Sequence, residues 1–180
     1  MRAPIPTAGD LAAVCRELID AWHREEPPLD WPAVCAAFAG GDGGWPDAVA
    51  RLCLINCFQW HLEDASRAAY SDALRLAELK REIDASNGRR VRWIDELDER
   101  LLEELGVTGD GPAPVAAVTP GNLLDRITIL ELKRCHAERD LRAMLDEQVG
   151  DACDALDRLV ADLACARQRV KRYRTVKLYG

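Results

Sequence analysis

The sequence lacks long hydrophobic runs, and aromatic residues make up only 6% of its 180 residues. No apolar run approaches the roughly 18–20 residues that a membrane-spanning helix needs. Residues 1–10 also lack the apolar stretch of a signal peptide. We therefore expect a cytoplasmic protein that does not insert into a membrane.

The sequence also lacks the short motifs that identify common reactions. It contains no nucleophile elbow, phosphate-binding loop or dinucleotide-binding glycine fingerprint. Its seven cysteines include no Cys-x-x-Cys pair, so a zinc knuckle is not expected. Most of them lie among apolar residues at helical spacing, and we interpret these as small buried hydrophobes.

Positive charge is scarcer than negative charge. The chain has 24 Lys and Arg against 31 Asp and Glu, a formal net charge of −7. A surface of this sign disfavours binding to nucleic acids and anionic membranes. No nucleic-acid or membrane partner is expected.

What is present is apolar spacing typical of helices, in a chain long enough to bury a sizeable core. The pattern predicts helices over 9–24, 31–38, 46–69, 72–105, 119–147 and 151–174. Local signals support these limits: Asp72 and Thr119 as N-caps, and Gly106 and Gly150 as stops. The sequence predicts an all-α, single-domain helical bundle of about five to six helices over residues 1–180. Within it, 1–45 form an N-terminal helical segment and 46–180 form the core.

Several polar residues lie on the apolar faces of these predicted helices. On the helix from residue 72 to 105, Lys80, Asp84, Asn87 and Asp98 fall within or beside the leucine stripe, and Arg90 flanks it. Burying a charge costs several kcal/mol unless it is paired. Two interpretations stay open: a structural ion-pair network or a functional site.

Two other helices show the same feature. His61 shares a face with apolar residues, and Asp64 follows one turn later. Asp125 and His136 share a face of a third helix but are about 16 Å apart along its axis. We expect one of these two residues to meet His61 or Asp84 from a neighbouring helix.

Three motifs carry a family resemblance. Residues 59–64 (QWHLED), 79–84 (LKREID, followed by Asn87 and Arg90) and 119–136 (TPGNLLDRITILELKRCH) resemble the signature of a bacterial family catalogued as domain of unknown function 4254. The resemblance implies an all-helical cytosolic protein and hints at carbohydrate metabolism. It implies no established chemistry. The chain departs from the family pattern at Arg89 and Arg92, where acids are usual.

From these observations we expect a small-molecule enzyme with a polar pocket inside the bundle. Its substrate would be anionic, such as a sugar phosphate, nucleotide sugar or nucleoside, and the reaction a hydrolysis or group transfer. The candidate acid–base residues are His61, Asp64, Asp84, Asp125 and His136. The candidate substrate-binding residues are Trp60, Arg67, Lys80, Asn87, Arg90, Arg126 and Lys133.

Two alternatives remain. The first is a non-catalytic accessory or ligand-binding protein that partners a glycosyltransferase or biosynthetic enzyme, or a homo-oligomer. The second is a divalent-metal site, although no cofactor is predicted. Its candidate ligands are His61, Glu63, Asp64, Asp84 and His136. The Glu-x-x-His pairs of di-metal bundles are absent, and the nearest string, from Asp20 to His23, lies on a helix end expected to be exposed.

Overall fold

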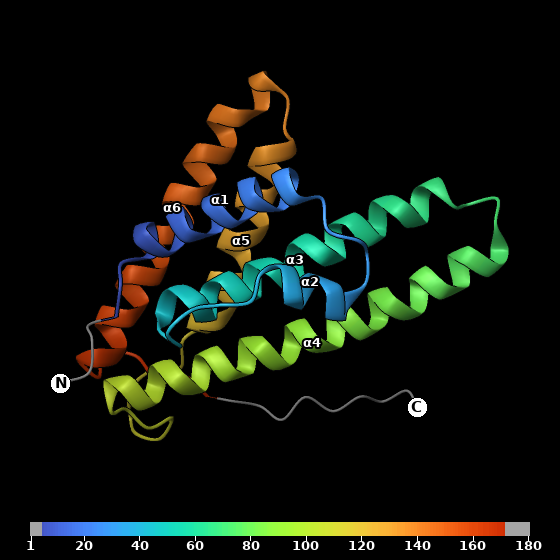
Figure 1. The fold of residues 1–180 in the computed structure, drawn as a ribbon. Coiled ribbons are helices and arrows are strands. Elements are labelled where there is room, and N and C mark those ends of the chain that lie inside the picture. Colours follow the sequence, from blue (N-terminus) through green and yellow to red (C-terminus); the bar gives the residue numbers. More distant parts are fainter. Residues whose placement is uncertain (1–4, 172–180) are drawn as a thin grey trace.

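The computed structural model describes residues 5–171, and this span contains six helices and no strand (Figure 1). The helices are α1 (Ala8–Glu25), α2 (Trp31–Ala37), α3 (Trp45–Ala68), α4 (Ala73–Leu105), α5 (Pro120–His136) and α6 (Arg139–Ala164). The predicted all-α bundle is confirmed. Within residues 5–171, no helix has the length and apolar character needed to cross a membrane.

Side-chain caps fix most helix starts. The side chains of Thr7, Asp30, Asp72 and Thr119 each accept a hydrogen bond from a backbone N–H in the first turn that follows. Such bonds satisfy N–H groups that have no partner inside the helix. At the other end of α4, Gly106 adopts a left-handed conformation with φ 66°, which glycine does at little cost. The predicted limits of α4 are therefore confirmed.

The predicted start of α5 at Thr119 and Pro120 is confirmed, but the predicted boundary between the last two helices is wrong. The chain breaks after His136, at Ala137 and Glu138, whose extended backbone has ψ 146° and 158°. Helix α6 then runs through Gly150 without interruption and ends at Ala164. A mid-helix glycine costs about 1 kcal/mol, and the buried neighbours Val149 and Ala152 compensate for that cost. The predicted end at residue 174 lies outside the described residues.

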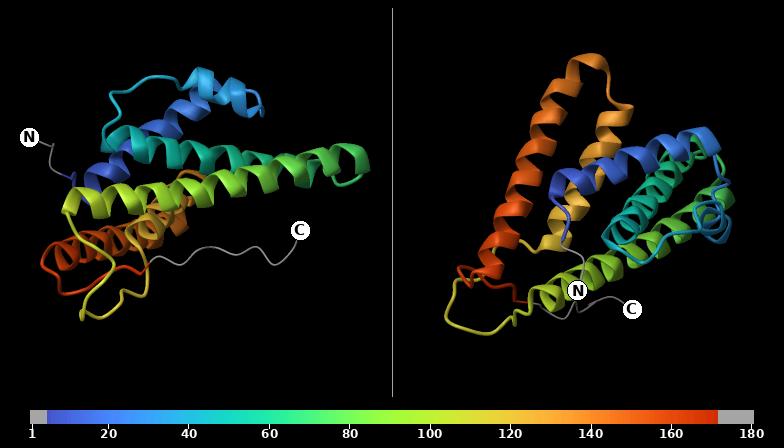
Figure 2. Two further views of the ribbon diagram at one scale, coloured as in Figure 1. Left: turned by 90° about the horizontal axis from the view of Figure 1, so that it is seen from below. Right: turned by 60° about the vertical axis from the view of Figure 1, so that its left-hand side comes forward.

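The helices form two antiparallel pairs with α1 packed across them. α3 pairs with α4, and α5 pairs with α6, so that the two hairpins cross each other (Figure 1). α1 contacts α3, α5 and α6, and Figure 1 and Figure 2 show it running across the α5–α6 hairpin. Buried side chains from all six helices form one hydrophobic cluster.

The crossing of α4 and α5 depends on Gly121. A Cβ atom at this position would lie 2.6 Å from the carbonyl oxygen of Ile94 and 3.0 Å from Oδ1 of Asp98. The Gly121 N–H donates to the same Asp98 oxygen at 2.6 Å. Asp98 is buried, as its place in the leucine stripe predicts. Its carboxylate faces the N-terminus of α5, where the helix dipole favours negative charge.

The cysteines follow the sequence prediction only in part. Cys15, Cys53 and Cys57 are buried, and Cys35 and Cys153 are half-buried. Cys135 and Cys165 are exposed. All seven are free thiols.

Candidate functional site

The buried face of α4 is narrower than the sequence suggests. Lys80, Asp84 and Asn87 are exposed, so the prediction that they lie on a buried face is wrong. Each follows a residue of the buried stripe directly: Leu79, Ile83 and Ser86. One step along a helix is a turn of about 100°. Because α3 alone pairs with this part of α4 (Figure 1), only a narrow seam is covered.

Arg90 and Asp125 form the central ion pair of the bundle. Arg90 Nε donates to Asp125 Oδ1 at 2.8 Å, and Arg90 Nη2 donates to Oδ2 at 2.5 Å. Asn56 Nδ2 donates to the same Oδ1 at 3.0 Å and to Thr128 Oγ1 at 2.5 Å. The hydrogen bond to Asp125 raises the pKa of Arg90. A carboxylate held by three donors is poorly placed to take a proton from a substrate, so Asp125 positions Arg90.

A pocket of about 320 Å³ opens beside this ion pair, and we call it the Trp60 pocket. Its lining comes from α3, α4 and α5: Asn56, Gln59, Trp60, Glu63, Arg67, Arg90, Ile129 and Leu132. Three predicted substrate-binding residues, Trp60, Arg67 and Arg90, meet here. The side-chain oxygen of Gln59 is buried and has no hydrogen-bond partner among the described residues.

The other predicted ligands of the substrate lie at the surface. Arg126 and Lys133 are exposed, and neither lines the Trp60 pocket. Asp64 is exposed and forms an ion pair with Arg67 one turn along α3. The structure therefore gathers part of the predicted set and leaves the rest in solvent.

Three histidine rings lie together where α1, α3 and α5 meet; we call them the histidine trio. His61 and His136, one of the pairings that the sequence leaves open, have ring centroids 5.7 Å apart. His23 joins them from the end of α1, with centroids 5.4 Å from His61 and 4.9 Å from His136. The sequence analysis places His23 on a helix end expected to be exposed and does not bring it to the other two rings.

Tryptophans cover two sides of the trio. Trp22 stacks on His61 with centroids 5.3 Å apart, and Trp60 stacks on His136 at 5.1 Å. The pKa values of His61 and His136 are both lowered, first by burial and then by the charge of His23. Both rings therefore favour the neutral form, which can act as a base or as a metal ligand.

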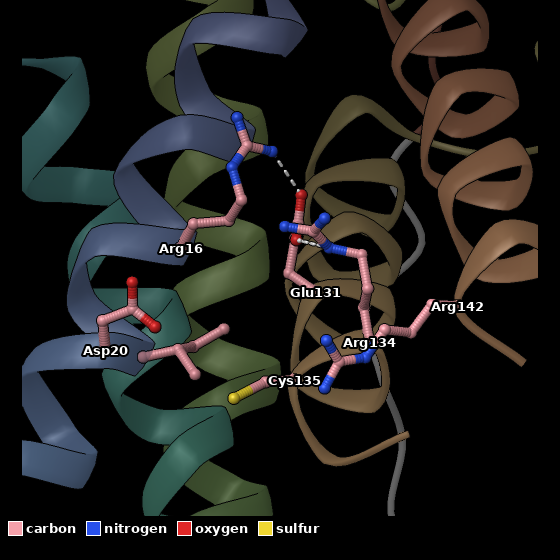
Figure 3. Close-up of a pocket in the computed structure, with 7 residues that line it drawn as sticks. Arg16, Asp20, Glu131, Arg134, Cys135 and Arg142 are labelled. Carbon is pink, nitrogen blue, oxygen red and sulfur yellow. Dashed lines mark hydrogen bonds and ion pairs between the residues drawn. The ribbon is translucent and has the colours of Figure 1, made fainter. Parts of the chain in front are cut away.

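A second pocket, of about 260 Å³, lies between α1 and α5 and contains a buried carboxylate. Glu131 accepts from Arg16 Nη1 at 2.7 Å and from Arg134 Nε at 2.9 Å (Figure 3). Arg134 also donates to Asp146 of α6 at 3.0 Å. Figure 3 shows the guanidinium of Arg142 reaching from α6 toward Cys135. Glu131 pairs with Arg16 of α1, and its neighbour Arg134 on α5 pairs with Asp146 of α6, so this cluster ties α1, α5 and α6 together.

Sequence reasoning missed several residues of these sites, among them Asn56, Glu131 and His23. Asn56 interrupts an apolar run between Ile55 and Cys57, and Glu131 interrupts one between Leu130 and Leu132. A polar residue inside an apolar run is a signal of buried pairing that could have identified both. His23 gives no such signal, because its position beside the other two histidines depends on how three helices pack.

The comparison with known proteins yields one match. The family described as "Protein of unknown function (DUF4254)" matches residues 46–144. This stretch includes His61, His136 and the whole Trp60 pocket, whereas His23 lies before it. No curated protein matches the chain. No solved structure matches it either.

Proposed function

Because this chain belongs to the DUF4254 family, whose description names no activity, we propose a function from its own site: the Trp60 pocket binds a small anionic organic molecule. One observation carries this proposal. Arg67 of α3 and Arg90 of α4 line the same pocket as the ring of Trp60. A pocket of about 320 Å³ is within the range of small-molecule sites.

Both arginines keep donors for a ligand. A guanidinium has five N–H donors; Arg90 uses Nε and Nη2 on Asp125, and Arg67 uses Nη2 on Asp64. The remaining N–H groups suit a carboxylate or phosphate. The ion pair with Asp125 also fixes the orientation of Arg90 before a ligand arrives, which lowers the entropy cost of binding.

The remaining lining favours a ligand with hydroxyl or amine donors and an apolar face. The oxygen of Gln59 has no partner among the described residues, and the carboxylate of Glu63 adds a second acceptor. Trp60, Ile129 and Leu132 provide apolar surface. A sugar phosphate or nucleotide sugar combines these features with an anionic group, and we propose this class of ligand. A nucleoside offers the hydroxyl groups and the apolar face without the anion.

An enzymatic role is the second candidate, favoured by the contact between the pocket and the histidine trio. The ring of Trp60 lines the pocket and stacks on His136 at an interplanar angle of 15°. In this proposal His136 and His61 act as acid and base in a hydrolysis or group transfer. Asp84 is exposed and Asp125 is held by Arg90, so we assign neither of them the proton transfer.

We propose a cytoplasmic protein of carbohydrate or nucleotide metabolism. This proposal rests on the family resemblance and on the ligand class inferred for the Trp60 pocket. The accessory role beside a glycosyltransferase or biosynthetic enzyme differs from the enzymatic one in needing no turnover. The protein is purified with and without candidate partner enzymes and assayed for turnover. Turnover by the protein alone favours the enzymatic role, whereas co-purification with a partner and no turnover favours the accessory role.

The proposal is tested by ligand binding. Purified protein is screened by thermal shift against sugar phosphates, nucleotide sugars and nucleosides, because a ligand of the native state raises the melting temperature. Titration calorimetry then measures the affinity of each hit. Arg67→Ala should weaken binding by about 10- to 100-fold, the effect of losing a charge-assisted hydrogen bond.

Arg75→Ala is the matched control. Arg75 and Arg67 are both exposed, and each forms an ion pair with an acid three residues away. Only Arg67 lines the pocket, so Arg75→Ala should leave the affinity unchanged. A screen without hits, or a ligand whose affinity is equal in the Arg67→Ala and Arg75→Ala variants, contradicts the proposal.

A further inference from the structure

We propose that the histidine trio binds one divalent transition-metal ion, with zinc as the ion that three imidazoles suit best. The full sequence contains three histidines. They are separated by 38 and 75 positions along the chain, from residue 23 to 61 to 136, and lie on three different helices. One nitrogen from each ring lies within 4.8 Å of the other two.

The ring arrangement fits tetrahedral coordination. With a metal–nitrogen distance of about 2.0–2.1 Å, three imidazoles around a tetrahedral ion have ring centroids roughly 5.2 Å apart. The centroids of the trio are 4.9, 5.4 and 5.7 Å apart. The three pairs of planes are inclined at 63°, 65° and 66°, so the rings surround a common centre and do not stack on one another.

Ion binding requires only a modest closure of the rings. The ligating nitrogens of such a site are about 3.3 Å apart, against an upper limit of 4.8 Å here. His136 is exposed and is the last residue of α5. Its side chain can therefore rotate toward the other two, and it leaves a path for the ion to enter.

Two of the ring nitrogens are available to an ion, and a hydrogen bond orients one of these rings. His23 Nδ1 lies 2.7 Å from the carbonyl oxygen of Ile19, so Nδ1 carries the proton and Nε2 presents its lone pair to the trio. This is the second-shell bond that orients metal-binding histidines. The Nε2 atoms of His23 and His61 are both buried without a hydrogen-bond partner among the described residues. A buried polar atom without a partner destabilises the folded state, and coordination of an ion offsets that cost.

The chemistry of the ligands selects the class of ion. Imidazole suits Zn²⁺, Co²⁺, Ni²⁺ and Cu²⁺, whereas Mg²⁺ and Ca²⁺ require mainly oxygen ligands. The set of three contains no carboxylate and no thiolate. Three protein ligands leave one tetrahedral position to water or a substrate, which is typical of catalytic zinc sites rather than structural ones.

The alternative is that the three rings only pack against Trp22 and Trp60. Packing and metal binding predict different spectra. Co²⁺ is the probe, because tetrahedral Co²⁺ absorbs visible light and replaces Zn²⁺ at similar sites. The full chain is treated with a chelator, desalted and titrated with Co²⁺, and Zn²⁺ is then added in competition. We expect one equivalent of Co²⁺ to bind with visible absorption bands, and Zn²⁺ to abolish them.

Variants assign the ligands. His136→Ala, His61→Ala and His23→Ala should each lower the Co²⁺ affinity by more than about 100-fold, since second-shell changes alone lower metal affinity by 10- to 100-fold. Cys135→Ser is the matched control, because it changes the exposed thiol beside His136 and should leave affinity and spectrum unchanged. Circular dichroism verifies the fold of each variant. His136 is exposed, so its replacement is not expected to unfold the protein. If the His61 or His23 variant unfolds, the Co²⁺ affinity of His136→Ala tests metal binding.

Three results would overturn the inference: no Co²⁺ or Zn²⁺ binding below millimolar concentrations, binding that His136→Ala leaves unchanged in a folded protein, or a thiolate-to-cobalt absorption band that Cys135→Ser removes. The readout does not depend on the ligand of the Trp60 pocket. The metal inference and the ligand proposal can therefore fail separately. Metal binding would replace the acid–base role of His61 and His136, because the lone pair of each ring would be used to coordinate the ion.

Discussion

Arg90 holds Asp125 with two parallel hydrogen bonds across the interface of α4 and α5. The carboxylate side chain is only 9% exposed and the guanidinium is 25% exposed. Removal of Arg90 would leave a buried carboxylate with Asn56 as its remaining side-chain donor. The cost of such a change is therefore larger than that of breaking a surface ion pair.

Arg90→Ala should lower the free energy of unfolding by about 3 kcal/mol. Arg90→Lys should lower it by about 1–2 kcal/mol, because lysine cannot form both bonds in one plane. Urea denaturation measures both. Arg75→Ala, which breaks an exposed pair, should change stability by less than about 1 kcal/mol. Equal losses for Arg90→Ala and Arg75→Ala would show that the buried pair contributes no more than a surface pair.

Gly121→Ala should destabilise the protein by about 1–3 kcal/mol, the range for overpacking. The added Cβ would lie 2.6 Å from a backbone oxygen of α4, so α4 and α5 would have to separate. Gly150→Ala is the matched control, since a Cβ there meets no atom within 4 Å. The free energy of unfolding of that variant should rise by up to about 1 kcal/mol, because alanine has a higher helix propensity than glycine. Thermal melts should show a lower melting temperature for Gly121→Ala and an unchanged or higher one for Gly150→Ala. A stabilised Gly121→Ala variant would contradict the close approach of α4 to Gly121.

Glu131→Ala should lower the free energy of unfolding by about 2 kcal/mol. The lost carboxylate is 1% exposed, whereas its partners Arg16 and Arg134 are 40% and 32% exposed and can turn to solvent. A double-mutant cycle with Arg16→Ala measures the coupling across α1 and α5. Glu147→Ala, an exposed glutamate of α6, should stay within about 0.5 kcal/mol of the parent protein. A Glu131 variant as stable as the Glu147 variant would refute the role of the cluster.

The buried thiols should make the protein less stable in alkali. The hydrogen bond with Cys53, followed by burial, raises the pKa of Cys15. The folded state therefore retains a proton that the unfolded state loses above about pH 8.5. The stability should be intact below that pH and decrease as the pH rises further. Urea denaturation at pH 7.5 and at higher pH measures the free energy of unfolding. Cys15→Ala should lose less stability at high pH than the parent protein. An equal loss in both would show that other groups cause it.

Thiol labelling provides a separate check on burial. Cys135 and Cys165 are exposed and should react with a thiol reagent in the native protein. Cys15, Cys53 and Cys57 have 0% exposure and should react only after urea is added. Mass spectrometry of labelled peptides distinguishes the two groups. Rapid labelling of Cys53 in the native state would contradict the packing of α3.

The sequence predicts well what is determined locally. Thr119, Asp72 and Gly106 mark helix ends through their own chemistry, and the structure places the ends there. The break after His136 has no such marker, because Ala137 and Glu138 are compatible with a helix. Packing of α6 back on α5 overrides their local preference. Gly150 shows the converse, since buried neighbours keep a poor helix former inside a helix.

The site was predictable only as far as helix faces reveal it. Periodicity identifies the direction of the buried stripe on α4, but its width depends on how many helices cover it. Asp98 is therefore buried as expected, whereas Asp84 is exposed. The contact between His61 and His136 is one of the four pairings that the helix faces allowed, and the sequence did not choose among them. The position of His23 beside the other two histidines could not be predicted, because it depends on where α1 lies across the other helices.

Helix α1 has a further consequence for how the chain can be rearranged. The backbone N–H of Ala8 donates to Asp157 Oδ1 of α6 at 2.9 Å, so the first and last helices adjoin although 149 positions separate the two residues. Contacts of α1 with α3, α3 with α4, α4 with α5, α5 with α6 and α6 with α1 thus close these five helices into a ring. A ring of this kind tolerates a new starting point in an exposed loop. The exposed Gly40–Gly43 stretch between α2 and α3 is where a circularly permuted chain could begin while keeping every helix contact intact.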